Sequence, residues 1–209
     1  AASDVDWREL VVDLRSTNPH TRWRGAHGLA QLLEADALRT RPFATAAEDS
    51  DAAGGCGSPD AAQVPFARDP ELARELAATL SQEFDRAEAG DEQQRLVEYL
   101  IKSLGWMDVP AEVLPTLRRG LENGREDWVV QQSLIAIGMV CGRARERGAA
   151  VDDAALLVDL QRIIAERTGV LRHLATYDLG FLANAEAESQ LSALLGDDDP
   201  LTRINAAIG

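Results

Sequence analysis

Residues 18–29 read NPHTRWRGAHGL, and residues 199–209 read DPLTRINAAIG. In both stretches a polar residue precedes a proline, an arginine follows three residues after the proline, and small and apolar residues come next. Such self-similarity at long range is typical of stacked helical units that bury their apolar faces against one another. The two stretches therefore predict an all-α fold, an α-solenoid.

Apolar residues recur at helical spacing through most of the chain and predict about five antiparallel helix pairs. The first four pairs are expected at residues 7–38, 70–104, 113–141 and 156–182. A fifth pair begins at Leu191, and its second helix is cut off at Gly209. We therefore expect an incomplete C-terminal repeat, so that the native chain continues past Gly209 or another copy covers the open apolar face.

Residues 39–69 interrupt the helical pattern. This segment contains three glycines and three prolines among alanine, serine and aspartate, and it has no apolar period. We expect a long, flexible insertion between pairs one and two. The remaining pairs are expected to form one domain over residues 1–209.

The second helices align with one another when counting starts at residues 18, 93, 126, 168 and 199. The fourth, eighth and twelfth positions are then apolar or small in every unit that contains them. A shared contact with a neighbouring helix requires this pattern. Without the insertion of about 31 residues, the intervals are about 44, 33, 42 and 31 residues, and all but the last fall in the range of about 33–47 residues that helical repeats show.

The repeated phrase resembles the Asp-Pro-x-Val-Arg-x-x-Ala-Ala-x-Ala-Leu-Gly pattern of HEAT-type repeats, including the HEAT-like repeats of phycobilin lyases. The matching residues are Asn18, Pro19 and Arg22, then Arg172, Ala175, Leu179 and Gly180, and finally Asp199, Pro200 and Arg203. The second and third units carry Val97 and Val130 at the arginine position, so only their spacing supports the resemblance. Tetratricopeptide repeats are the nearest alternative, but their Trp-x-x-Leu-Gly-x-x-Tyr phrase is absent from the sequence.

This resemblance covers most of the chain apart from the insertion. It implies an α-solenoid whose second helices line the concave surface and whose usual role is to bind other proteins. One enzyme family with HEAT repeats, the deoxyhypusine hydroxylases, binds iron through His-Glu dipeptides. Here His20, His27 and His173 are followed by Thr, Gly and Leu, so the resemblance does not extend to that activity.

The net charge of −14 comes from 35 acidic and 21 basic side chains. A field of this sign repels nucleic-acid backbones and anionic membranes, whereas it attracts basic proteins. The sequence contains no apolar stretch of the roughly 20 residues that a membrane span needs, and its first residues do not resemble a secretion signal. We therefore expect a cytoplasmic protein without nucleic-acid or membrane partners.

Positions six, seven, ten and fourteen of each second helix are expected to point toward the concave face. The residues predicted to bind a partner are Trp23, Arg24, His27, Tyr99, Trp106, Gln132, His173, Tyr177 and Phe181. Aromatic side chains that stay partly exposed are enriched at interfaces. We expect a groove centred on Tyr99, Trp106, Tyr177 and Phe181; the alternative is that these rings only fill space between successive units.

No sequence motif indicates catalysis. The chain lacks a glycine-rich phosphate loop, a nucleophile elbow and a paired catalytic carboxylate motif. Its histidines lack metal-ligand spacing, and the aspartates at 197–199 fit helix capping better than a cation site. We therefore expect neither enzymatic activity nor a bound metal or cofactor.

These observations favour a non-catalytic adaptor or scaffold that binds a protein or peptide, particularly a basic one, on its concave helical surface. Two alternatives remain open. The repeat family alone suggests a chromophore-lyase-like accessory protein, and the acidity suggests an inhibitor or immunity protein that masks a basic partner. The oligomeric state does not follow from the sequence.

Overall fold

The computed structural model describes residues 6–39, 65–86 and 90–209. Over these ranges the chain forms ten α-helices, one 3-10 turn and no strand, so the predicted all-α class is confirmed. None of the helices described combines the length and the apolar character that a membrane crossing requires. The elements are α1 (Trp7–Leu14), α2 (Pro19–Arg39), η1 (Phe66–Arg68), α3 (Pro70–Phe84), α4 (Asp91–Trp106), α5 (Pro110–Arg119), α6 (Asp127–Glu146), α7 (Ala154–Glu166), α8 (Gly169–Leu179), α9 (Ala185–Leu194) and α10 (Pro200–Ile208).

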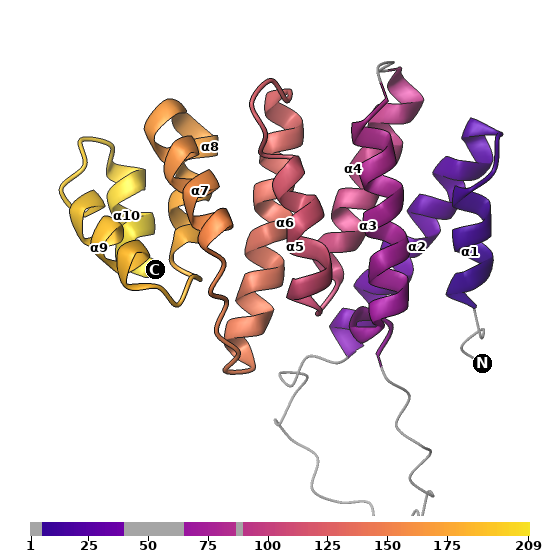
Figure 1. Ribbon diagram of the computed structural model, residues 1–209, viewed down its shortest axis with the longest axis horizontal. Helices are drawn as coiled ribbons and strands as arrows, with labels where there is room; N and C mark the ends of the chain where they lie inside the picture. Colours follow the sequence, from indigo (N-terminus) through magenta and orange to yellow (C-terminus); the bar gives the residue numbers. More distant parts are fainter. Residues whose placement is uncertain (1–5, 40–64, 87–89) are drawn as a thin grey trace, which may run out of the picture.

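Neighbouring helices pack in pairs: α1 with α2, α3 with α4, α5 with α6, α7 with α8, and α9 with α10. The even-numbered helices α2, α4, α6, α8 and α10 also pack against one another in succession, and we call them the even layer. Helices α1, α3, α5 and α7 form a second succession of contacts, the odd layer. Figure 1 shows the pairs following one another across the molecule from the N-terminal end to the C-terminal end.

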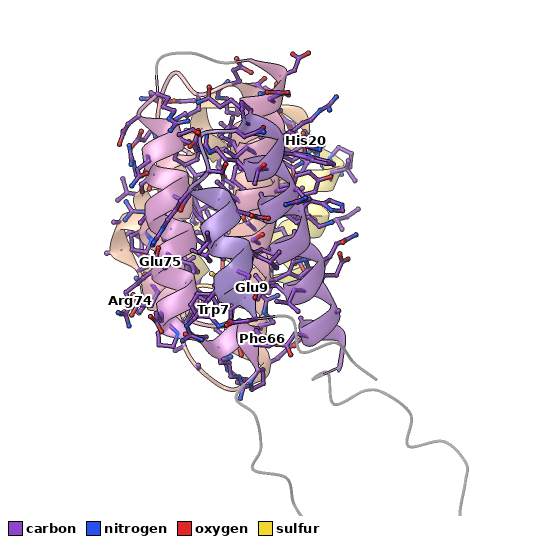
Figure 2. The ribbon with its side chains drawn as sticks, turned by 90° about the vertical axis from the view of Figure 1, so that its right-hand side faces the viewer. Trp7, Glu9, His20, Phe66, Arg74 and Glu75 are labelled. Atoms are coloured by element: carbon purple, nitrogen blue, oxygen red, sulfur yellow. The ribbon has the colours of Figure 1, made fainter. Side chains whose placement is uncertain are left out.

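The two layers lie on opposite sides of the molecule when it is viewed along this row. In Figure 2, His20 of α2 lies on one side, whereas Arg74 and Glu75 of α3 lie on the other. Trp7 of α1 lies between them and is 5% exposed. The even layer therefore presents an outer face that the odd layer does not cover.

Side-chain caps mark where α2 and α10 begin. Asn18 Oδ1 accepts the His20 N–H at 3.0 Å, and Asp199 Oδ1 accepts the Leu201 N–H at 3.1 Å, which agrees with the helix capping predicted for residues 197–199. Proline in the first turn of α2 and α10 suits a helix start because its missing N–H has no partner to lose there. The repeated phrase thus starts two helices of the even layer.

The register expected for the second helices matches the observed burial. All fourth, eighth and twelfth positions are buried except Thr21, which is half-buried. The core residues at the twelfth position are Leu29, Leu104, Ile137 and Leu179. These positions hold each even helix against its neighbours.

Small residues let the even helices approach closely at a recurring point. The thirteenth position of one even helix meets the eleventh position of the next. A Cβ built on Gly105 would lie 3.1 Å from the Ala136 Cα, which is tighter than ordinary packing. The contacts of this kind are Gly105 with Ala136, Gly138 with Asp178, and Gly180 with Gly209.

Two of the three arginines at this position of the phrase, Arg22 and Arg172, connect one helix pair to the next. Arg22 of α2 forms an ion pair with Glu83 near the end of α3, the first helix of the next pair. Arg172 of α8 pairs in the same way with Asp197, just after α9, at 2.5 Å. At the equivalent position the second and third units bury apolar side chains instead. These are Val97 and Val130.

Most of the predicted insertion at 39–69 lies outside the described residues. Its ends do not match the prediction, because Arg39 belongs to α2 and residues 66–68 form the turn η1. Ala67 is 4% exposed, its N–H donates to Asp36 Oδ2 at 3.1 Å, and its carbonyl oxygen accepts the Asp108 N–H at 2.6 Å. These bonds attach the turn to α2 and to the segment after α4, so the insertion is shorter than predicted.

Candidate functional site

All nine residues predicted to bind a partner lie in the even layer or directly after it. Seven of them are half-buried, whereas Arg24 and Tyr177 are exposed. The half-buried residues are Trp23, His27, Tyr99, Trp106, Gln132, His173 and Phe181. The structure brings them together in two separate places and leaves three of them outside both.

The N-terminal aromatic cluster consists of His20, Trp23, His27 and Tyr99. The Trp23 ring stacks on His27, with ring centres 5.5 Å apart, and on His20 at 5.8 Å. Tyr99 of α4 meets His27 edge to face at 5.0 Å and Trp23 at 6.2 Å. His20 is not among the residues predicted to bind a partner, although residues 20, 23 and 27 have the helical spacing that places them on one face.

The α6–α8 groove has a volume of about 760 Å³ and contains the other predicted aromatic residues. Trp106, Met139, Tyr177 and Phe181 line it, and Tyr177 meets Phe181 edge to face with ring centres 5.0 Å apart. Two glycines on α6, at positions 138 and 142, contribute no side chain to the space. Both glycines face residues of α8 or of the segment after it: Gly138 faces Asp178, and Gly142 faces Phe181.

Asp178 lies at the base of this groove and is not among the residues predicted to bind a partner. Its side chain is 2% exposed, and Oδ2 has no hydrogen-bond partner among the described residues. Burial raises the pKa of the Asp178 carboxyl well above its ordinary value. Asp178 occupies the eleventh position of its second helix, where other units carry small residues: Gly28, Ser103 and Ala136. A comparison of this position among the units could have identified it.

The guanidinium groups that line the groove bind backbone carbonyls. Arg143 Nη2 donates to the Met107 carbonyl at 2.8 Å and also to the Gly105 carbonyl. Arg145 Nη1 donates to the Gly180 carbonyl at 3.2 Å. Both arginines thus connect α6 to the ends of the neighbouring even helices.

Arg24, His173 and Gln132 lie outside the two clusters. Arg24 pairs with Asp13 of α1 at 3.2 Å, so its guanidinium extends toward the odd layer. His173 Nε2 contacts Asp199 Oδ2, and this hydrogen bond lowers the pKa of the Asp199 carboxyl. His173 therefore helps to hold α10 against α8, while Gln132 is half-buried on α6. Within the described ranges, no three His, Cys, Asp or Glu residues are grouped so that they could hold a metal ion.

The two glycines of α6 give a matched pair of substitutions. A Cβ on Gly138 would lie 2.5 Å from Asp178 Oδ1, whereas a Cβ on Gly142 would lie 3.5 Å from Phe181 Cε1. We expect Gly138→Ala to lower the free energy of unfolding by about 1–3 kcal/mol because it overpacks a buried contact. Gly142→Ala should raise it by up to about 1 kcal/mol through helix propensity. Urea denaturation followed by circular dichroism measures both values.

Asp178→Ala in the Gly138→Ala background is the control for this comparison. Removal of the carboxylate relieves the overlap, so the double variant should recover most of the stability that Gly138→Ala loses. Equal losses from Gly138→Ala and Gly142→Ala would contradict the close contact between α6 and Asp178.

No family model matches the chain, and no curated protein and no solved structure matches it at a significant level. Its function is therefore inferred from the geometry of the even layer.

Proposed function

We propose that this chain is a HEAT-like α-solenoid of five antiparallel helix pairs, forming one domain, that acts as a non-catalytic cytoplasmic adaptor. In this proposal it binds a protein or peptide along the concave face, which the even layer provides. The observation that carries the proposal is the α6–α8 groove, in which Trp106, Tyr177 and Phe181 leave ring surface beside a space of about 760 Å³. Rings of this kind bury large areas on binding at a small cost in side-chain entropy.

An extended partner accounts for the two clusters better than a small ligand does. The N-terminal aromatic cluster joins α2 to α4, while the groove lies between α6 and α8. Both belong to the same layer, and the contacts between even helices place them in succession. A small molecule would occupy only one of them, whereas a peptide or the surface of a protein can contact both.

The charge of the chain favours a basic partner. With a net charge of −14, the protein attracts positively charged surfaces over a distance of about one Debye length, roughly 8 Å at physiological salt. Such attraction accelerates encounter and selects against acidic partners. Aromatic contacts in the even layer would then provide the short-range affinity.

Site-specific photo-crosslinking tests the proposed surface. Benzoylphenylalanine replaces Tyr177 on α8, which is 39% exposed, or Val158 on α7, which is 61% exposed. We expect a discrete crosslinked protein from position 177 and none from position 158, because only the first lies in the even layer. Mass spectrometry of the crosslinked species in cells that produce the protein gives the readout.

The substitution Tyr177→Ala separates binding from packing. Tyr177 is exposed and, among the described residues, its ring meets that of Phe181, so Tyr177→Ala should cost less stability than the roughly 3–5 kcal/mol of a fully buried aromatic residue. Crosslinking from a second groove position, Ile135, should nevertheless fall strongly in this variant. A large loss of stability with unchanged crosslinking would show that the aromatic residues only fill space between helices.

A further inference from the structure

Asp178 and Trp106 are among the residues with buried polar atoms that line the α6–α8 groove. Asp178 Oδ2 accepts no hydrogen bond, and the Trp106 indole N–H donates none, among the residues that the structure describes. The Asp178 side chain is 98% buried, since 2% of it is exposed. Buried carboxylates are normally paired, because an unpaired charge in a protein interior is costly. The groove thus offers one acceptor and one donor to a ligand.

Packing between the repeats does not explain an acidic residue at position 178. The equivalent positions in the other even helices hold Gly28, Ser103 and Ala136, so a small side chain satisfies this contact elsewhere. Across the contact, Gly138 has no side chain that could hydrogen-bond to the carboxylate. A buried acid that breaks a local pattern, and whose Oδ2 has no hydrogen-bond partner in the described ranges, is characteristic of a functional site.

We propose that Asp178 anchors an arginine or lysine side chain of the partner, which enters the α6–α8 groove between Tyr177, Phe181 and Trp106. This inference rests on the proposed function, since it names the chemistry of the partner at one point of the even layer. The three aromatic rings suit a cation because their faces attract positive charge. The Trp106 N–H supplies a donor for a backbone carbonyl of the same segment.

The charges around the groove are compatible with a cation at its base. Arg143 directs Nη2 to the carbonyls of Gly105 and Met107 and lies near the Trp106 ring, with Cζ 5.9 Å from its centre. Arg145 and Glu146 are both exposed at the rim, where water screens them and their charges offset one another. Asp178 is therefore the buried acid of the lining that an incoming basic side chain would meet.

The test uses two small probes that differ in charge and are nearly equal in shape: acetyl-arginine amide and acetyl-citrulline amide. Each is titrated to millimolar concentration into the isotopically labelled full chain, and backbone and indole signals are followed by NMR. We expect the arginine probe to shift the signals of Trp106, Tyr177 and Phe181, and the citrulline probe to bind at least about 10-fold more weakly.

Two variants make the result specific to Asp178. Asp178→Asn keeps the shape and removes the carboxyl group, which would release its proton when the arginine probe binds, and it should weaken binding of the arginine probe by about 10- to 100-fold. Glu9→Gln removes one charge from an exposed residue of α1, in the odd layer, and should leave the affinity unchanged within about 2-fold. Circular dichroism and the dispersion of the NMR signals check that both variants are folded.

Equal binding of the two probes, an unchanged affinity in Asp178→Asn, or shifts confined to the N-terminal aromatic cluster would each overturn the inference. Crosslinking from position 177 distinguishes failure of the Asp178 anchor from failure of the proposed binding face. Crosslinking from position 177 that persists in Asp178→Asn would retain the even layer as the binding face and reject the anchor. Absence of crosslinking from position 177 would instead contradict the proposal that the even layer is the binding face.

Discussion

Glu83→Ala is expected to destabilise the protein by about 3–5 kcal/mol, because it leaves a largely buried guanidinium without its partner. The Glu83 side chain is 1% exposed and that of Arg22 is 14% exposed. Arg22 also donates from Nε to the Leu14 carbonyl at 3.2 Å, so one side chain joins α1, α2 and α3. Chemical denaturation, followed by tryptophan fluorescence and circular dichroism, measures the change in free energy of unfolding.

A double variant provides the control for Glu83→Ala. Arg22→Val combined with Glu83→Leu removes both charges and places at position 22 the residue type that the second and third units carry. We expect the double variant to be more stable than either single variant, because no buried charge remains unpaired. If the losses from Arg22→Val and Glu83→Leu simply added, the two side chains would not interact and the inter-repeat role of Arg22 would be wrong.

Features set by local sequence were predictable from the chain alone. Asn18 and Asp199 cap their helices because short polar side chains satisfy the first free N–H groups, whatever the rest of the fold does. The positions at which the second helices are buried were also predictable, because apolar residues recur there at helical spacing. Where valine replaces the arginine, at positions 97 and 130, both side chains are buried, and the sequence pattern did not give their contacts.

Contacts between repeats could not be predicted from helical spacing. Tyr99 and Trp106 lie on one face of α4, but seven residues separate them by about 10 Å along the helix axis. Tyr99 therefore joins Trp23 of α2, while Trp106 lines the groove with residues of α6 and α8. The expected single groove contained residues from two places because the sequence does not give the position of one helix along its neighbour.

The residues of the candidate site could also be predicted only in part from the sequence. The aromatic residues of the groove were predictable because their type is rare in this chain and their register is regular. Asp178 was missed because its register assigns it to the buried side of α8, where an apolar or small residue is expected. A buried acid can be recognised from sequence only when the equivalent positions of other repeats are compared with it.

Asp178→Asn should make the protein more stable than the wild type at neutral pH, and the advantage should grow as the pH rises. Burial raises the pKa of Asp178 in the folded state, whereas the unfolded chain has the ordinary value of about 3.9. Above that pH the folded protein holds a proton that the unfolded chain has released. The wild type therefore loses about 1.4 kcal/mol per pH unit until the folded pKa is reached, while asparagine does not titrate.

The measurement is the difference in free energy of unfolding between Asp178→Asn and the wild type, followed from about pH 4 upward. Titration of the other groups largely cancels in this difference, and nearby Cys141 stays protonated because burial raises its pKa to about 12. Asp199→Asn, compared with the wild type below about pH 4, provides a control of opposite sign. The bond from His173 lowers the pKa of Asp199, so the wild type should lose its advantage over that variant as the pH falls through the lowered pKa. A difference between Asp178→Asn and the wild type that stays constant with pH would mean that Asp178 is charged and compensated in the folded protein, contrary to its unpaired position beneath the groove.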